Sequence, residues 1–234
     1  MSTISLAPHQ HPSQIDSQSI DHWIFDLDNT IYPAKTSLFP RVAEKMGLFI
    51  AETFDLPIDE AMALKTRLFR EYGTTMHGLM HEFKMEPTPF LDYVHEIDLS
   101  DIDIDPDYDA MLSALPGDKH IFTNGTVRHA ERILEAYGIR HHFDVIFDIV
   151  AADYVPKPDR KPYDLFLGVS GINPQRAIMV EDMARNLEVP SALGMKTVWL
   201  TSNEAWAIEG SDQPYIDFIA EDNKSLLAGI TASA

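Results

Sequence analysis

Short apolar stretches recur along the chain and alternate with segments of helical period. The candidate strands span residues 22–28, 119–125, 144–150, 176–182, 196–201 and 215–220. Between them, segments such as 126–137 repeat apolar residues at helical spacing, and Gly138 follows the last of these residues. Strands that alternate with helices predict an α/β fold, in which a Rossmann-like parallel sheet carries helices on both faces.

One long interval interrupts this alternation. Residues 29–118 contain no strand candidate, and their periodicity predicts helices at about 38–54, 57–72, 76–84 and 88–96. We therefore expect a small α-helical cap over residues 34–110, inserted after the first strand. The remaining core would comprise residues 21–33 and 111–234. Because ligands bind at the carboxyl edge of such sheets, the cap would cover a ligand site.

The cap is expected to end in an acidic segment, residues 97–109, which contains six aspartates. The spacing of Asp101, Asp103 and Asp105 resembles a calcium loop. However, Pro106 stands where that loop needs glycine, and no glutamate closes it. The pattern favours a solvated acidic linker.

Composition narrows the classes of ligand. With 18 Lys+Arg against 37 Asp+Glu, the formal net charge is −19, which disfavours nucleic acid and anionic membranes as partners. The same charge repels a phosphorylated metabolite, so a site for one must supply local positive charge. Hydrophobic residues make up 45% of the chain, enough for a large core. The absence of cysteine excludes disulfides, thiolate metal sites and thiol nucleophiles.

The beginning of the chain is polar and rich in Ser, Gln and Pro. It lacks the pattern of a signal peptide, and no apolar run in the chain approaches the length of a transmembrane helix. We expect residues 1–20 to form a mobile tail with His9 and His11 in solvent. A cytoplasmic location is expected, and the oligomeric state stays open.

Polar side chains lie in four stretches, three at the ends of predicted strands and one in a loop that follows a predicted strand. Each stretch has an ordinary structural reading: a turn at Asp28, a helix N-cap at Thr126, a solvated surface lysine, and a helix start after the fourth strand. In a parallel sheet, however, all four would meet at one edge. The stretches are "FDLDNT" with Asp26, Asp28 and Thr30; "FTNG" with Thr123, Asn124 and Gly125; "VPKP" with Lys157; and "VED" with Glu181 and Asp182.

In this order, the four stretches resemble the motifs of the haloacid dehalogenase-like hydrolase superfamily. The resemblance covers the chain after about residue 20, including the position of the cap. Within the superfamily, "FDLDNTIYP" and "REYGTTMHGLM" are similar to the pyrimidine 5′-nucleotidase branch.

The resemblance implies hydrolysis of a phosphate ester through an aspartyl-phosphate. Asp26 would be the nucleophile, and Asp28 would protonate the leaving oxygen and then activate water. Mg²⁺ would bind Asp26, the backbone carbonyl of Asp28 and Asp182, with Glu181 bound directly or through water. Thr123 and the amides of Asn124 and Gly125 would hold the phosphoryl oxygens. Lys157 would neutralise developing charge, and it fits better than Lys161 because Tyr163 follows it by six residues.

The substrate implied by the branch is a pyrimidine nucleoside 5′-monophosphate, a small phosphorylated metabolite. A loop at 72–78 would close over it, with Tyr72 and Thr74 in contact. The alternative reading is a plain helix–helix turn with Tyr72 in the cap's own core. In the dehalogenases of the superfamily the residue two positions after the nucleophile is not an acid, so the resemblance, with Asp28 at that position, implies an oxygen leaving group rather than a halide. Phosphonatases of the superfamily use a cap lysine that forms an imine with the substrate. Lys65 and Lys84 lie in the predicted cap, but neither lies in an evident motif.

Three other functions stay open at this point. A sugar-phosphate phosphatase and a phosphomutase would use the same motifs. A receiver domain for phospho-aspartate signalling uses similar residues, but there the acidic pair comes first in the chain and no long insert is present.

Overall fold

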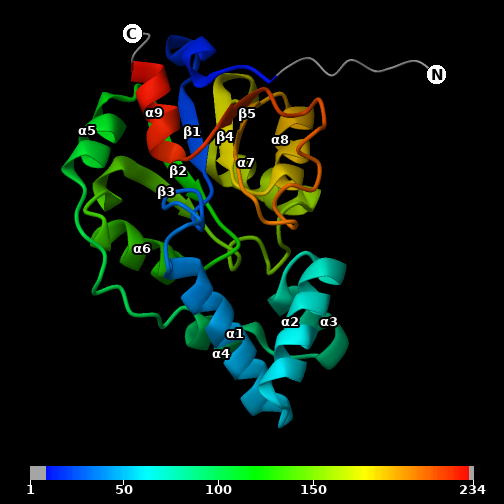
Figure 1. Cartoon of the computed structure of the whole chain (residues 1–234). Coiled ribbons are helices and arrows are strands. Elements are labelled where there is room, and N and C mark those ends of the chain that lie inside the picture. Colours follow the sequence, from blue (N-terminus) through cyan, green and yellow to red (C-terminus); the bar gives the residue numbers. More distant parts are fainter. Residues whose placement is uncertain (1–8, 232–234) are drawn as a thin grey trace.

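A six-stranded parallel sheet forms the centre of the protein. The computed structural model describes residues 9–231 (Figure 1). The strand order is β3-β2-β1-β4-β5-β6, and every pairing is parallel. The sheet confirms the predicted fold class. The strands are β1 His22–Phe25, β2 Asp118–Phe122, β3 Phe143–Phe147, β4 Ala177–Glu181, β5 Lys196–Leu200 and β6 Phe218–Ala220.

Alternation along each strand divides the core between the two faces of the sheet. In β1, Trp23 and Phe25 join one buried cluster, whereas Ile24 joins the other. The first face is covered by α5 (Pro106–Ala114), α6 (Val127–Ala136) and α9 (Asn223–Thr231), and the second by α7 (Arg160–Ser170) and α8 (Glu188–Leu193) (Figure 1). With both faces covered, the carboxyl edge of the sheet is where the core is open to a ligand.

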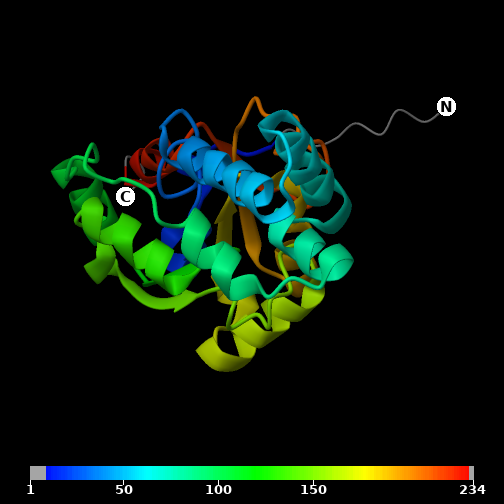
Figure 2. The ribbon, with the colours of Figure 1, turned by 90° about the horizontal axis from the view of Figure 1, so that it is seen from below.

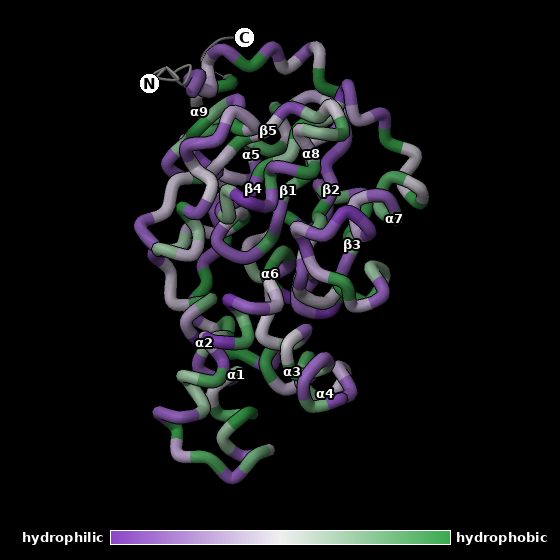
Figure 3. The backbone as a smooth tube through the Cα atoms, turned by 90° about the vertical axis from the view of Figure 1, so that its right-hand side faces the viewer, coloured by the Kyte–Doolittle hydropathy of each residue, from purple (hydrophilic) through white to green (hydrophobic). Residues whose placement is uncertain are grey.

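Four helices lie below this edge and form the cap (Figures 1 and 2). They are α1 Leu38–Phe54, α2 Ile58–Tyr72, α3 Thr75–Phe83 and α4 Pro87–Val94, each within two residues of its predicted bounds. Helix α1 packs against α2 and α4, and α3 packs against the same two helices. Figure 3 shows the four helices as a separate group beneath the sheet.

The acidic segment that follows the cap is irregular up to residue 105, and four of its six aspartates are exposed, as predicted for a solvated acidic linker; two of the six have cationic partners. Asp101 forms an ion pair with Arg41, with 2.8 Å between its Oδ1 and the guanidinium. Asp105 caps α5 and pairs with Lys224 at 2.7 Å. These aspartates therefore bind cationic side chains and backbone, which does not fit a calcium loop.

Helix α5 packs with the core, although its first half falls within the predicted cap range of 34–110. The hydroxyl of Tyr108 donates to the carbonyl of Ile31 (3.1 Å) and accepts from the side chain of Asn223 (2.7 Å). The predicted boundary at residue 110 therefore falls inside this helix, because the sequence pattern does not show which domain a short helix packs against.

Residues 9–20 correct the prediction of a mobile tail. Ile15 and Ile20 are buried, and they flank the short 3₁₀ helices η1 Pro12–Gln14 and η2 Ser17–Ser19. The ring nitrogens of His9 lie 3.2 Å from the Ile216 carbonyl and 3.1 Å from the Ser211 carbonyl, so His9 is not in solvent. His11 is exposed, as expected. Besides the two isoleucines, the buried Pro12 and the backbone hydrogen bonds of Gln10 with Asp217 and Ile219 anchor this stretch. Residues 1–8 lie outside the described part.

The connections contain three further 3₁₀ helices: η3 Arg140–His142, η4 Pro174–Arg176 and η5 Ala184–Leu187. Across residues 9–231, none of the helices combines the length and apolar character needed to cross a bilayer.

Candidate active site

Four charged side chains meet at the point where β1 and β4 lie side by side. Asp26 directly follows β1, Glu181 ends β4, and Asp182 comes next, while Lys157 reaches in from the loop after β3. In the order of this sheet, the connections leave β1 and β4 in opposite directions, which is where parallel α/β sheets bind ligands. All four residues are buried, with exposed fractions of 1–6%.

Lys157 joins these strand ends. Its Nζ donates to Oδ1 of Asp26 at 2.7 Å, to Oε2 of Glu181 at 2.8 Å and to the carbonyl of Phe122 at 2.8 Å. Burial alone would lower the pKa of Lys157, but the two carboxylates outweigh it and raise the pKa above its ordinary value. The ammonium therefore stays charged and holds Asp26 in place.

The site carries more buried negative charge than Lys157 can balance. Three carboxylates face a single ammonium. Burial and the charge of Glu181 raise the pKa of Asp26 and of Asp182. In addition, Oδ2 of Asp182 is buried without a hydrogen-bond partner among the described residues. Asp26, Glu181 and Asp182 each offer an oxygen within 4.8 Å of the others.

Asp28 is held by a different set of partners. Its Oδ1 accepts hydrogen bonds from Nε2 of His129 at 3.0 Å and from the hydroxyl of Tyr32. Burial would raise the pKa of Asp28, but His129 and the hydroxyl of Tyr32 outweigh this effect and lower it. The two aspartates of "FDLDNT" thus border one cavity in different environments, Asp26 on a lysine and Asp28 on a histidine.

His129 was not identified from the sequence. It lies in the first turn of α6, and its ring stacks on that of His95 with 4.2 Å between ring centres. The Thr126 hydroxyl lies 3.1 Å from Nδ1 of His95, and its oxygen accepts from the backbone N–H of His129 at 3.3 Å. Burial and the neighbouring His129 lower the pKa of His95 to about 3, so that ring is neutral. Its position in the sequence could have identified it, because the first helical turn after "FTNG" lies at the carboxyl edge of the sheet, where the site was predicted.

The "FTNG" stretch builds the wall beside Asp26. Oγ1 of Thr123 accepts from the backbone N–H of Gly125 at 2.9 Å, so this amide already has a partner within the protein. Oδ1 of Asn124 accepts from the backbone N–H of Lys157 at 2.9 Å and positions that loop. A Cβ atom at residue 125 would lie 3.2 Å from Oγ1 of Thr123 and 3.3 Å from the ring of His129. A side chain at this position would therefore have to displace Thr123 or His129 by a few tenths of an ångström.

A cavity of about 270 Å³ lies between this edge and the cap. Nine of the ten residues predicted for the site line it, including Thr74, which also caps α3 by accepting from the backbone N–H of His77 at 3.1 Å. Tyr72 does not line it. Its ring packs within the cap, 5.1 Å from the ring of His81 and 6.4 Å from that of His77. The placement of Tyr72 follows the alternative reading, a side chain of the cap's own helix pair.

The chain matches the family model of haloacid dehalogenase-like hydrolases over residues 20–194. This protein belongs to the haloacid dehalogenase-like hydrolase family. Membership accounts for the order of the four stretches and for the cap inserted after β1. It also sets aside the receiver-domain reading.

Among proteins of known name, the chain is similar to phosphate metabolism protein 8 of Saccharomyces cerevisiae. The two are 27% identical over 192 residues, which cover 74% of this chain and 59% of the yeast protein. The matched region therefore spans about three-fifths of that relative.

Solved structures share the fold at low sequence identity. CbbY from Rhodobacter sphaeroides, solved in complex with phosphate, has a TM-score of 0.61 and 19% identity, and the match covers 91% of this chain and 99% of CbbY. YfnB from Bacillus subtilis, solved bound to magnesium, has a TM-score of 0.55 and 16% identity over 89% of this chain and 97% of YfnB.

The carboxylates of this family member fit a divalent cation of the magnesium type. Every donor in the cluster of Asp26, Glu181 and Asp182 is an oxygen, as Mg²⁺ prefers. The free Oδ2 of Asp182 and the excess of buried negative charge both call for a second cation beside Lys157.

Proposed function

We propose that this protein is a Mg²⁺-dependent phosphomonoesterase that acts through a phosphoryl group on Asp26. One observation supports this most directly. Two carboxylates border the same cavity, Asp26 bonded to Lys157 and Asp28 bonded to His129 and Tyr32. A nucleophile and a separate proton donor are what hydrolysis of a phosphate ester requires.

In the first step, an Asp26 oxygen attacks phosphorus and the bond between phosphorus and the ester oxygen breaks. Asp28 is ionised in the resting protein, so it first takes up the proton of the monoanionic phosphate ester as this binds; it then gives that proton to the departing oxygen, which leaves as an alcohol. In the second step, water attacks phosphorus, Asp28 takes its proton, and the bond to Asp26 breaks to release inorganic phosphate. His129 and the Tyr32 hydroxyl would hold Asp28 at the leaving-group side throughout.

The remaining residues of the site would stabilise charge. Lys157 donates to Asp26 in the resting protein and would neutralise the phosphoryl oxygens as charge develops. Thr123 and the backbone of Asn124 would bind the same oxygens. A Mg²⁺ held by Asp26, Asp182, the Asp28 carbonyl and Glu181 would supply a positive charge that screens the anionic substrate from the carboxylates.

We propose a pyrimidine nucleoside 5′-monophosphate as the substrate. The cavity is lined mainly by apolar side chains on its cap side, which suits a base better than a free sugar. The net charge of −19 also favours a small metabolite over nucleic acid. A sugar-phosphate phosphatase or a phosphomutase would need more polar groups in the cap to bind sugar hydroxyls.

A substrate panel with Mg²⁺ tests this proposal. UMP, CMP, AMP, ribose 5-phosphate and glucose 6-phosphate would be compared by release of inorganic phosphate, with and without a chelator. We expect kcat/KM for UMP and CMP to exceed that for either sugar phosphate by about tenfold or more, and chelation to abolish turnover. Preference for glucose 6-phosphate would contradict the nucleotide assignment, and full activity in the chelator would contradict the metal.

A further inference from the structure

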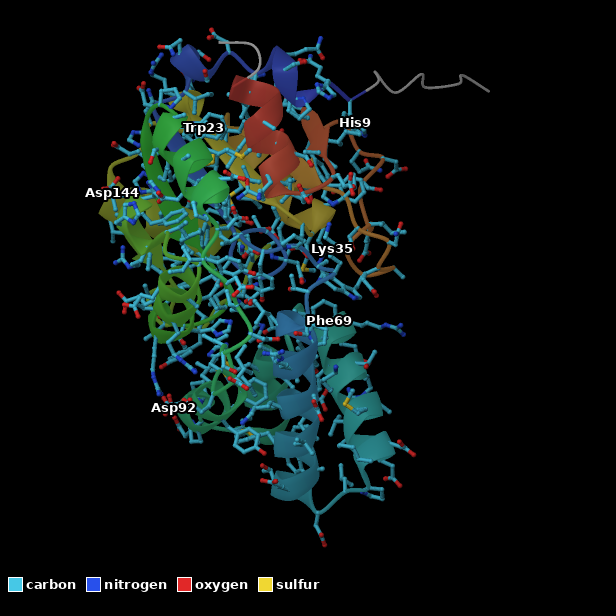
Figure 4. The ribbon with its side chains drawn as sticks, turned by 60° about the vertical axis from the view of Figure 1, so that its left-hand side comes forward. His9, Trp23, Lys35, Phe69, Asp92 and Asp144 are labelled. Atoms are coloured by element: carbon cyan, nitrogen blue, oxygen red, sulfur yellow. The ribbon has the colours of Figure 1, made fainter. Side chains whose placement is uncertain are left out.

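The cap side of the cavity is lined mainly by apolar side chains, together with Thr66, Thr74, Thr75 and His95. The apolar side chains include Phe39, Val42 and Met46 of α1, Phe69 of α2, Phe90 of α4, and Trp206 from the segment between β5 and β6. The Trp206 ring lies 6.1 Å from that of Phe39 and 5.9 Å from that of Phe69, measured between centres. Figure 4 shows Phe69 at the end of the cap that faces the core. This half of the cavity therefore suits a flat, apolar ring.

Among residues 9–231, Lys65 is the one charged side chain that the cap contributes to the lining of the cavity. It precedes Phe69 by one helical turn on α2, so the two side chains lie on the same face of that helix. Of all the lining residues, only Lys65 and Lys157 carry a positive charge. Lys157 is bonded to two carboxylates, whereas the ammonium of Lys65 has no hydrogen bond or ion pair within residues 9–231.

Two other cap cations have polar partners within the described residues. Lys84 donates to the carbonyl of His81 at 2.9 Å, and Arg67 pairs with Glu71 and Glu82. Burial lowers the pKa of Lys65, and no nearby acid opposes this. A half-buried ammonium without a partner is costly, and a ligand in the cavity can provide the missing acceptor.

The backbone around Lys65 is tied to the catalytic edge. The Thr75 hydroxyl donates to the carbonyl of Lys65 at 3.2 Å. The adjacent turn reaches the core, because a Cβ atom at Gly73 would lie 3.8 Å from Pro156 and 3.9 Å from the carbonyl of Lys157. The two lysines thus belong to contacting segments on opposite sides of one cavity.

We propose that Lys65 donates a hydrogen bond to a carbonyl oxygen on an uncharged ring of the substrate's leaving group. The assignment rests on the proposed phosphomonoesterase function and narrows its substrate class. A second phosphate or a carboxylate would have to leave water for an apolar wall with one ammonium to balance it, which is unfavourable. A neutral carbonyl forms a charge-assisted bond without that cost. The oxo group of a pyrimidine base has this chemistry.

Binding to a catalytically inactive background provides the first test. In Asp26→Asn protein, the dissociation constants of UMP and ribose 5-phosphate would be measured by calorimetry, with and without Lys65→Met. We expect Lys65→Met to weaken UMP about 10- to 100-fold, the loss of one charge-assisted bond, and to change ribose 5-phosphate less than twofold. The control Lys84→Met should leave both constants unchanged, because Lys84 is exposed and lies outside the cavity.

Turnover of the otherwise native enzyme gives the second test. Lys65→Met should raise KM for UMP about tenfold while kcat changes little. Phenyl phosphate, which has a ring but no carbonyl, should keep its kcat/KM within about twofold. Phosphoglycolate, whose leaving group carries a carboxylate, would be measured as a third substrate. The assignment would be overturned by equal losses on UMP and phenyl phosphate, by an unchanged KM for UMP, or by a loss seen only with phosphoglycolate. If UMP binding depends on Lys65 but no phosphomonoester is hydrolysed, the assignment holds and the proposed function fails.

Discussion

The two sides of the cavity are built in opposite ways. The core side consists of the ends of parallel strands and carries buried charges that are bonded to one another, as in the contacts of Lys157 with Asp26 and Glu181. The cap side consists mainly of helix faces and is largely apolar, and the ammonium of Lys65 has no hydrogen bond or ion pair within residues 9–231. Charged groups that are already held in place on the core side would stabilise one type of reaction, whereas the apolar cap side with the donor of Lys65 would select the leaving group. We therefore expect changes on the core side to alter the rate for every substrate, and changes on the cap side to alter which substrate is preferred.

The largest effect is expected at the centre of the core side. Asp26→Asn removes the nucleophile and should lower kcat on the order of 10⁴-fold for every substrate. The melting temperature, followed by circular dichroism, should not fall, because the change removes one of the excess buried negative charges. Activity near that of the native protein would disprove the nucleophile assignment.

Lys157→Met should lower both activity and stability. It leaves Asp26 and Glu181 buried without their cation, and breaking such a pair costs about 3–5 kcal/mol. We expect kcat to fall about 10²- to 10³-fold. Lys161→Met is the matched control, since Lys161 forms its ion pair with Asp153 at the surface, and it should change the free energy of unfolding by less than about 1 kcal/mol. Equal effects of the two changes in urea titrations would contradict the role of Lys157.

His129→Gln tests the second carboxylate and should have a smaller effect. Glutamine can donate one hydrogen bond to Asp28 but cannot carry a positive charge. The kcat for UMP should fall about tenfold or more because its poor leaving group needs a proton. p-Nitrophenyl phosphate, which needs less protonation, should lose less. A uniform loss on both substrates would show that His129 does not act through Asp28.

The smallest effect is expected at Tyr72. Its ring packs against His81 inside the cap and does not line the cavity. Tyr72→Phe should therefore leave KM and kcat for UMP within about twofold of the native values. A rise in KM of tenfold or more would instead indicate that Tyr72 contacts the substrate.

The sequence predicted the core side more fully than the cap side. Strand ends that carry site residues can be predicted from the sequence, because a charged residue directly after an apolar run is unusual. A parallel sheet then brings these ends together at one edge. This reasoning found Asp26, Asp28, Thr123, Lys157 and the pair Glu181–Asp182, all of which border the cavity. It missed His129 because a histidine in the first turn of a helix has no distinctive spacing.

The cap residues that line the cavity could not be predicted from the sequence in the same way. The helices were predicted within two residues, but which residues of a helix face the cavity depends on how the cap is oriented on the core. Periodicity does not give that orientation. Tyr72 and Lys65 both lie on α2, yet only Lys65 lines the cavity. The boundary of the cap and the anchoring of residues 9–20 were missed for the same reason, since both depend on long-range contacts.

The central claim is that Asp26 carries the phosphoryl group during turnover. The most direct test is to quench the reaction of Asp28→Asn protein with p-nitrophenyl phosphate in acid and to examine its peptides by mass spectrometry. This substrate needs little protonation of its leaving group, so it should still load Asp26, whereas the variant should slow the later attack by water. The account predicts a phosphoryl group on the peptide at Asp26 and none in the Asp26→Asn, Asp28→Asn double variant. Phosphate release from p-nitrophenyl phosphate by the native enzyme, with the phosphoryl group on another residue or on none in the quenched variant, would contradict it.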